Sequence, residues 1–333
     1  MTKLHTSVAV LQLVERGLIT LDEDVSRFIP SFAKQKILIG ITDDGAPILR
    51  KRQNPITLRH LLTHSAGAGY LFTSESLVKV AQWKNLSRKA GTVDEVFDLP
   101  LLYEPGEAFM YSSSVDRAGQ VVEQLTGRSL EDYMRRHIWE PLGMDSTTFF
   151  PGKHPDIQAR QAHMTYSTDN ESPVAENPNA QTFTTFLREP FGGQGLFSSM
   201  RDYVKLLHSL LVDDEKVLKK ETAAMMFQPQ LSPASKSDLL DKMKNPWWIV
   251  GDYPVTGEYD WGLASILTDG DSHPYRKNGT LTWFGAANTF WFIDREAGVC
   301  GVFGTQVLPP FNARIKPLIK AFEEDVYRRA GKL

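Results

Sequence analysis

Residues 1–30 read MTKLHTSVAVLQLVERGLITLDEDVSRFIP, and the apolar pattern of the first half of this stretch predicts a buried helix. From residue 4 to residue 17, apolar side chains are distributed nearly all round a helix instead of along one stripe. Gly17 then ends the pattern. A helix with no polar face needs neighbours on every side, so we expect helix 4–17 to lie inside the protein.

The composition is that of a globular domain that binds a small molecule. The chain has 333 residues, of which 41% are hydrophobic and 23% charged. Its 37 basic and 40 acidic residues give a net charge of -3, so no basic surface for nucleic acid or anionic lipid is expected. The single cysteine, Cys300, excludes an internal disulfide and a CxxC metal site.

The start of the chain does not have the pattern of a signal peptide. Gln12, Glu15 and Arg16 interrupt the apolar run that follows Lys3, and no small-residue cleavage site comes after it. No stretch approaches the roughly 18 apolar residues of a membrane span. We therefore expect a cytoplasmic protein without a membrane segment, while the oligomeric state stays open.

The order of the elements predicts an α+β fold in one domain, residues 1–333. Helices are expected at 56–64, 112–126, 130–138, 200–211 and 219–227, and an irregular stretch at 151–190. After residue 246 come the strand-like segments WWIVG, YDWGLASILTD, HPYRKNGT, AANTFWFIDRE and GVCGVFGTQ, followed by an amphipathic helix at 312–330. We expect an antiparallel sheet, residues 246–333 with helix 4–17, beside an all-helical lobe, residues 18–245.

Several common catalytic motifs are absent from the sequence. It has no HExxH, no GxxxxGK[ST] and no GxGxxG after a strand, and HSAGAG lacks the leading glycine of GxSxG. The acidic groups Asp43-Asp44 and Asp213-Asp214-Glu215 have the pattern of solvated turns and not of metal ligands. Neither a metal nor a cofactor is expected.

Four further segments carry a resemblance that extends over nearly the whole chain. These are ITLRHLLTHSAG at 56–67, EPGEAFMYSSSVDRAGQ at 104–120, FGGQGLFSSMRDYVKL at 191–206 and TLTWFGAANTFWFIDREAG at 280–298. Together with residues 1–30, they resemble the β-lactamase-related serine hydrolases. This family includes class C β-lactamases, penicillin-binding proteins, esterases and fungal acyltransferases, and its fold is α+β.

The resemblance implies a role for each of a few residues. Lys3 matches the lysine of the family's SxxK motif, Tyr111 with Ser113 matches the tyrosine motif, and Trp283-Phe284-Gly285 stands where β-lactamases have KTG. Lysine can take the serine's proton only when it is neutral, which burial and the positive end of a helix favour. Tyr111 would pass the proton to the leaving group, and the N–H of Ala286, after Gly285, would bind the oxyanion.

The departures from the family pattern refine the expected function. Without the lysine of KTG, an ester, thioester or amide is favoured over a β-lactam, and FWFIDREAG with TQVLPP most resembles the fungal acyltransferases and esterases. The SxxK serine would stand directly before Met1, and the family's first helix and strands are missing with it. We expect a serine hydrolase or acyltransferase that is inactive as written. The alternative is a pseudoenzyme or small-molecule binding protein of the same fold.

Some residues allow more than one interpretation. Trp283 could line an acyl pocket or could only pack. Arg59, His60 and His64 are close in sequence, but we expect them to serve as scaffold. Thr2 as an amino-terminal nucleophile is a weaker third hypothesis.

Overall fold

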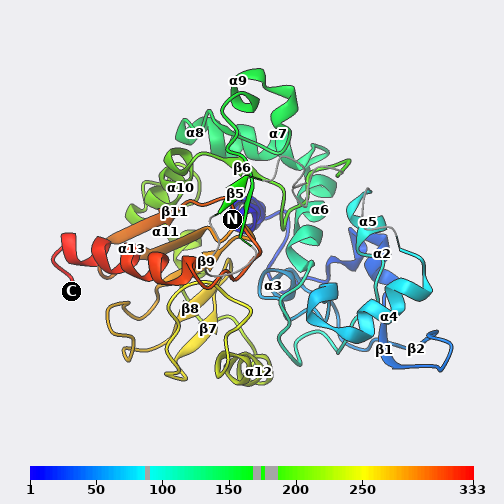
Figure 1. Ribbon diagram of the computed structural model, residues 1–333. Helices are drawn as coiled ribbons and strands as arrows, with labels where there is room; N and C mark the ends of the chain where they lie inside the picture. The colour runs from blue at the N-terminus through cyan, green and yellow to red at the C-terminus, as the bar shows by residue number, and fades with distance from the viewer. Residues whose placement is uncertain (87–90, 168–173, 177–186) are drawn as a thin grey trace.

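The computed structural model describes residues 1–333 except 87–90, 168–173 and 177–186 (Figure 1). A five-stranded antiparallel sheet has the order β11-β10-β9-β8-β7. Its strands are β7 (Tyr259–Trp261), β8 (Ile266–Thr268), β9 (Leu281–Phe284), β10 (Phe290–Asp294) and β11 (Val299–Phe303). Because each strand pairs with the next one along the chain, the sheet is the meander that the sequence predicts.

Helix α1 (Thr2–Glu15) is the element around which the chain is packed. Every residue from 2 to 13 is buried, and the helix packs against α6 (Ser114–Thr126) and α7 (Leu130–Met134). Gly17 follows with φ of +69°, a left-handed conformation that glycine adopts without strain. The prediction of a helix buried on all sides is confirmed.

Two long helices cover the sheet. Helix α10 (Met200–Val212) packs on β10 and β11, and α13 (Ile315–Arg329) packs on β11, in front of the sheet in Figure 1. The other helices are η1 (Val25–Arg27), α2 (Pro30–Ala33), α3 (Leu58–Leu62), η2 (Leu71–Thr73), α4 (Glu75–Trp83), α5 (Val93–Val96), η3 (Arg135–Trp139), α8 (Glu140–Leu142), η4 (Pro151–Lys153), α9 (Pro155–Gln158), α11 (Lys220–Met226) and α12 (Pro233–Met243).

Short strands also occur outside the five-stranded sheet. The pairs are β1 (Lys36–Ile41) with β2 (Pro47–Lys51), β3 (Thr147–Thr148) with β6 (Phe197–Ser198), and β4 (Thr165–Tyr166) with β5 (Ala175–Glu176) and β12 (Val307–Leu308). The sequence did not predict the β1–β2 hairpin, which lies in the lobe expected to be all helical, or helices α4 and α12. Part of the irregular stretch predicted at 151–190 lies outside the described residues.

Two of the predicted strands are wrong. HPYRKNGT, residues 273–280, is a turn. Nδ1 of His273 accepts hydrogen bonds from the backbone N–H groups of Tyr275 and Arg276. These two N–H groups are therefore not available to a neighbouring strand. WWIVG follows Pro246, and its first residue, Trp247, donates its N–H to the carbonyl of Asn245 in a tight turn. In both segments β-forming residue types are outweighed by local turn contacts.

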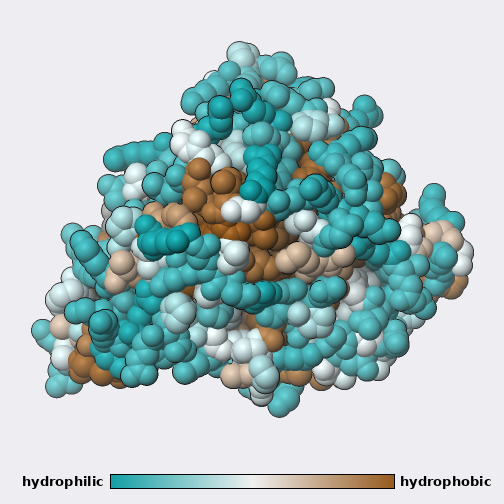
Figure 2. Space-filling model, turned by 180° about the vertical axis from the view of Figure 1, so that it is seen from behind, coloured by the Kyte–Doolittle hydropathy of each residue, from teal (hydrophilic) through white to brown (hydrophobic). Residues whose placement is uncertain are grey.

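The surface is mostly hydrophilic. Seen from behind, it has an apolar area near the middle of the face (Figure 2). Large exposed apolar side chains include Ile39, Phe72 and Trp247. Within the described residues, no helix combines the length and the apolar character needed to cross a membrane.

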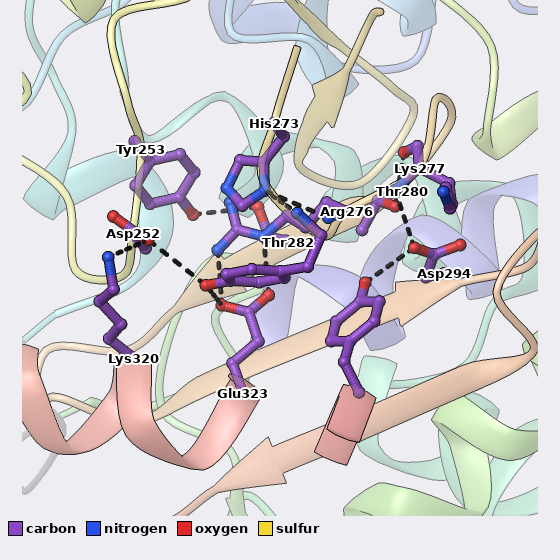
Figure 3. A network of polar contacts seen from close by, with 12 residues as sticks. Asp252, Tyr253, His273, Arg276, Lys277, Thr280, Thr282, Asp294, Lys320 and Glu323 are labelled. Atoms are coloured by element: carbon purple, nitrogen blue, oxygen red, sulfur yellow. Dashed lines mark hydrogen bonds and ion pairs between the residues drawn. The ribbon is translucent and has the colours of Figure 1, made fainter. Parts of the chain in front are cut away.

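A buried polar network fixes α13 to the sheet lobe (Figure 3). The guanidinium of Arg276 donates two hydrogen bonds of 2.7 Å to the carboxylate of Glu323, and both side chains are fully buried. The Tyr275 hydroxyl donates to the same carboxylate at 3.3 Å, and the Tyr327 hydroxyl donates to Asp294 of β10 at 2.7 Å. The network therefore connects the last helix to the 273–277 turn and to the sheet.

The first prediction concerns this buried ion pair. We expect Glu323→Ala to lower the free energy of unfolding by about 3–5 kcal/mol, because it leaves the charge of Arg276 buried without a partner. Urea unfolding of the purified chain measures the difference. Lys320→Ala is the control, since its ion pair with Asp252 is half exposed and is expected to contribute about 0–1 kcal/mol. Equal effects of the two substitutions would contradict the account.

The second prediction concerns acid. Burial, and after it the charge of Arg276, lowers the pKa of His273 to about 3, while a histidine in the unfolded chain takes up a proton near pH 6.5. The contribution of His273 to stability is therefore complete above about pH 6.5, and falls toward pH 3 by up to about 1.4 kcal/mol per pH unit. In urea unfolding, the stability difference between the unsubstituted chain and His273→Gln should narrow as the pH falls. A difference that does not depend on pH would refute this.

Candidate active site

Lys3 lies in the first turn of α1, with only 3% of its surface exposed. Its Nζ donates one hydrogen bond of 2.8 Å to the carbonyl of Gly193 and another of 3.2 Å to the hydroxyl of Tyr70. Nζ also lies 4.7 Å from the ring centroid of Tyr111. Two oxygen acceptors and an aromatic face thus replace the water that the buried ammonium has lost.

Tyr111 lies in the loop just before α6, and its ring is fixed by other aromatic rings. The ring centroids of His64 and Trp283 lie 4.8 Å and 5.0 Å from that of Tyr111, and that of Tyr70 lies 5.4 Å away. These contacts hold Tyr111 against Lys3. The two residues expected to move protons are therefore neighbours, although 108 positions separate them in the sequence (111 minus 3).

The end of strand β9 reaches the N-terminal end of α1. The amino group of Met1 donates to the carbonyl of Phe284 at 3.3 Å, and a Cβ added to Gly285 would lie 3.1 Å from Cγ of Met1. Ala286 is exposed, and no hydrogen bond of its N–H is found among the described residues. The structure therefore brings Lys3, Tyr111 and the Gly285–Ala286 turn to one end of α1.

Trp283 and Ser113 were also expected at the site, and the side chains of both are buried. Trp283 is 1% exposed, with its ring packed between those of Tyr111 and Trp261, so packing is favoured over lining a pocket. Ser113 is buried as the N-cap of α6, without a side-chain capping bond. Ser113 lies two residues after Tyr111, and its carbonyl accepts the N–H of Asp116 at 3.1 Å in the first turn of α6.

Arg59, His60 and His64 serve as scaffold, as the sequence predicts. Arg59 pairs with Asp22, and the side chain of His60 accepts the N–H of Thr57 to cap α3. Nδ1 of His64 accepts the backbone N–H of Ser112 at 3.2 Å, next to Tyr111. Burial, with a further contribution from the charge of Lys3, holds the pKa of His64 well below its usual value, so the ring is neutral.

Sequence reasoning missed two residues of the site, Tyr70 and Asp116. The Asp116 carboxylate is fully buried, and it accepts the Gly193 N–H at 2.9 Å and the Tyr70 hydroxyl at 3.3 Å. Burial raises the pKa of Asp116, and burial together with the nearby Asp116 charge raises the pKa of Tyr70 well above its usual value. Tyr70 lies outside the segments that resemble the family, and Asp116 lies inside one of them, at 104–120, without a role that the resemblance implies; the fold brings both to Lys3.

A cavity of about 390 Å³ lies beyond the glycine-rich turn that holds Lys3. Gly195, two residues after Gly193, is part of its lining, together with four phenylalanines, Phe149, Phe150, Phe191 and Phe197, and the charged residues Lys153 and Glu189. The cavity adjoins the turn and does not contain Lys3. In the part of the chain that the structure describes, no three histidine, cysteine, aspartate or glutamate residues are grouped to hold a metal.

Comparison with known proteins gives a consistent set of matches. Residues 1–322 match the Beta-lactamase family. The chain is 38% identical to lovastatin esterase of Penicillium rubens, covering 98% of this chain and 84% of that protein. It is 36% identical to monacolin J acid methylbutanoyltransferase of Aspergillus terreus, covering 98% and 80%.

Solved structures also match this chain. A mutant of simvastatin synthase (LovD) from Aspergillus terreus superposes with a TM-score of 0.91 at 35% identity, over 100% of this chain and 80% of that one. EstCE1, a hydrolase with promiscuous acyltransferase activity, has a TM-score of 0.74 at 23% identity and shares the fold, over 98% of this chain and 83% of that one.

The site geometry yields a third prediction. A Cβ on Gly193 would collide with the Asp116 carboxylate, 2.8 Å from its Cγ. We expect Gly193→Ala to lower the free energy of unfolding by about 1–3 kcal/mol, because the site has no room for a methyl group. Gly152→Ala is the matched control, since nothing lies within 4 Å of its added Cβ. Urea unfolding compares the two, and a Gly193→Ala chain as stable as the control would contradict the packing described here.

Proposed function

Because the chain belongs to the Beta-lactamase family, we propose that its site transfers an acyl group from an ester or thioester through a serine acyl-enzyme. The acceptor is water or an alcohol. The observation that carries the proposal is the position of Nζ of Lys3, which faces the ring of Tyr111 at the end of α1 where β9 ends.

The proposed roles follow from this geometry. The neutral amine of Lys3 takes the proton of the serine hydroxyl as the acyl group is attacked. Tyr111 passes the proton to the leaving group. The N–H of Ala286 and that of the serine stabilise the oxyanion, and such a donor typically contributes about 3 kcal/mol to the transition state.

The nucleophile belongs three positions before Lys3 in the SxxK pattern, which is the position directly before Met1. We propose that a serine at that position is the nucleophile of the site. The contact between the Met1 amino group and the carbonyl of Phe284 supports this placement, because it brings the start of α1 next to the proposed oxyanion donor.

The substrate class we propose is a small ester or thioester without a β-lactam ring. Trp283-Phe284-Gly285 offers no lysine to bind a β-lactam carboxylate. The relatives named as lovastatin esterase and monacolin J acid methylbutanoyltransferase support ester cleavage and acyl transfer, respectively.

The fourth prediction tests these roles with p-nitrophenyl butyrate. The printed chain should show no turnover, and a version with a serine directly before Met1 should release p-nitrophenol. In that version, Lys3→Met and Tyr111→Phe should each lower kcat by about 10²–10⁴-fold, because each removes a proton-transfer group. Lys244→Met, which removes a lysine whose side chain is 72% exposed and does not line the cavity, is the control.

Two results would overturn the proposal. Turnover by the printed chain equal to that of the serine version would place the nucleophile elsewhere. A folded serine version without turnover would favour the alternative, a non-catalytic binding protein of this fold.

A further inference from the structure

Asp116 accepts hydrogen bonds from the same two residues, Gly193 and Tyr70, that accept hydrogen bonds from Lys3. The Lys3 ammonium donates to the carbonyl of Gly193 and to the hydroxyl of Tyr70. Asp116 accepts the N–H of the same glycine through Oδ1 and the hydroxyl of the same tyrosine through Oδ2. Among the described residues, each hydrogen bond that Lys3 donates from its amine thus ends on a group that is also fixed by one buried carboxylate.

We propose that Asp116 is a positioning residue for Lys3, acting through Tyr70 and the Gly193 peptide. The proposal rests on the proposed function only in taking Lys3 as the base. The positioning itself concerns hydrogen bonds of the folded chain and can be measured without a substrate.

The direction of the hydrogen bonds explains why a carboxylate is needed. A phenol has one proton, and in Tyr70 it points to Asp116, which leaves the oxygen free to accept from Lys3. An asparagine at position 116 would have only one acceptor oxygen. Either the Gly193 N–H or the Tyr70 hydroxyl would then face an NH₂ group, and the support of Lys3 would be weakened on that side.

The charges nearby indicate that Lys3 influences Asp116 more strongly than its sequence neighbour Arg117 does. The guanidinium of Arg117 bonds to Asp94, Gln120 and the carbonyl of Phe97. It is therefore directed away from Asp116. Burial raises the pKa of Asp116, and the charge of Lys3, which shares hydrogen-bonding partners with this carboxyl group, acts against that rise.

The test observes the Lys3 ammonium directly in the printed chain. Protein labelled with ¹⁵N-lysine gives an ammonium resonance only where exchange of the protons with water is slow. The Lys3 resonance is identified by its loss in Lys3→Arg. We expect it to be present in the unsubstituted chain, and its hydrogen exchange to become about tenfold faster or more in Asp116→Asn and in Tyr70→Phe, as for the loss of one buried hydrogen bond.

Two matched substitutions separate positioning from a general loss of stability. Asp202→Asn changes another buried carboxylate, which accepts from Ser146 and Thr147, and Tyr259→Phe removes another buried tyrosine hydroxyl, which donates to Pro254. Neither residue touches Lys3, so both controls should leave its exchange rate unchanged. Tyr70→Phe adds no atoms and keeps the test available if Asp116→Asn does not fold.

The proposal is overturned if Lys3 gives no protected resonance in the unsubstituted chain. It is also overturned if exchange in both site variants stays within about twofold of the controls, a change smaller than that expected from one lost hydrogen bond. A failure of ester hydrolysis leaves these outcomes unaffected, because the measurement contains no substrate.

Discussion

The burial of one ammonium group constrains the whole site. Removing a charge from water costs several kcal/mol unless hydrogen bonds and an opposite charge compensate. Lys3 is 3% exposed, and its compensation comes from the carbonyl of Gly193, the hydroxyl of Tyr70 and the ring of Tyr111. These groups come from three separate loops, so folding must bring all three to the first turn of α1.

Helix α1 can bring these loops together because the rest of the chain surrounds it. Its N-terminal end meets strand β9, and its sides pack on α6 and α7 of the helical lobe. A residue in its first turn is therefore close to a sheet strand and to helical-lobe loops at once. An amine, a phenol and a backbone N–H can share one site at this junction, and acyl transfer through a serine requires these groups.

The sequence predicts most of the architecture because the relevant signals are local. All-round apolar burial marks α1, and α6 ends at Thr126, the predicted boundary, where Gly127 follows in a left-handed conformation. Three connections between successive strands of the sheet are short, at 262–265, 285–289 and 295–298, while that between β8 and β9, at 269–280, is longer. The predicted strands at 247–251 and 273–280 failed because strand propensity does not register a turn that a side chain such as that of His273 stabilises.

The site was predicted only in part. Lys3, Tyr111 and Gly285 could be found because they stand in motifs that resemble a known family. Asp116 stands in the first turn of a helix, where acidic residues are common for reasons of the helix dipole, and nothing local distinguishes it. Its relation to Lys3 runs through the partly buried Tyr70, and depends on how three loops pack, which no pattern in one segment contains.

The most direct test of the account is to locate the acyl group. The version with a serine before Met1 is mixed with a p-nitrophenyl ester and quenched, and its peptides are then analysed by mass spectrometry. We expect the acyl mass on the peptide that contains Lys3, on the added serine, with much less of it when Tyr111 or Lys3 is substituted. An acyl group on another residue such as Ser7, or labelling that is indifferent to both substitutions, would contradict the central claim that α1, Tyr111 and the end of β9 form one acyl-transfer site.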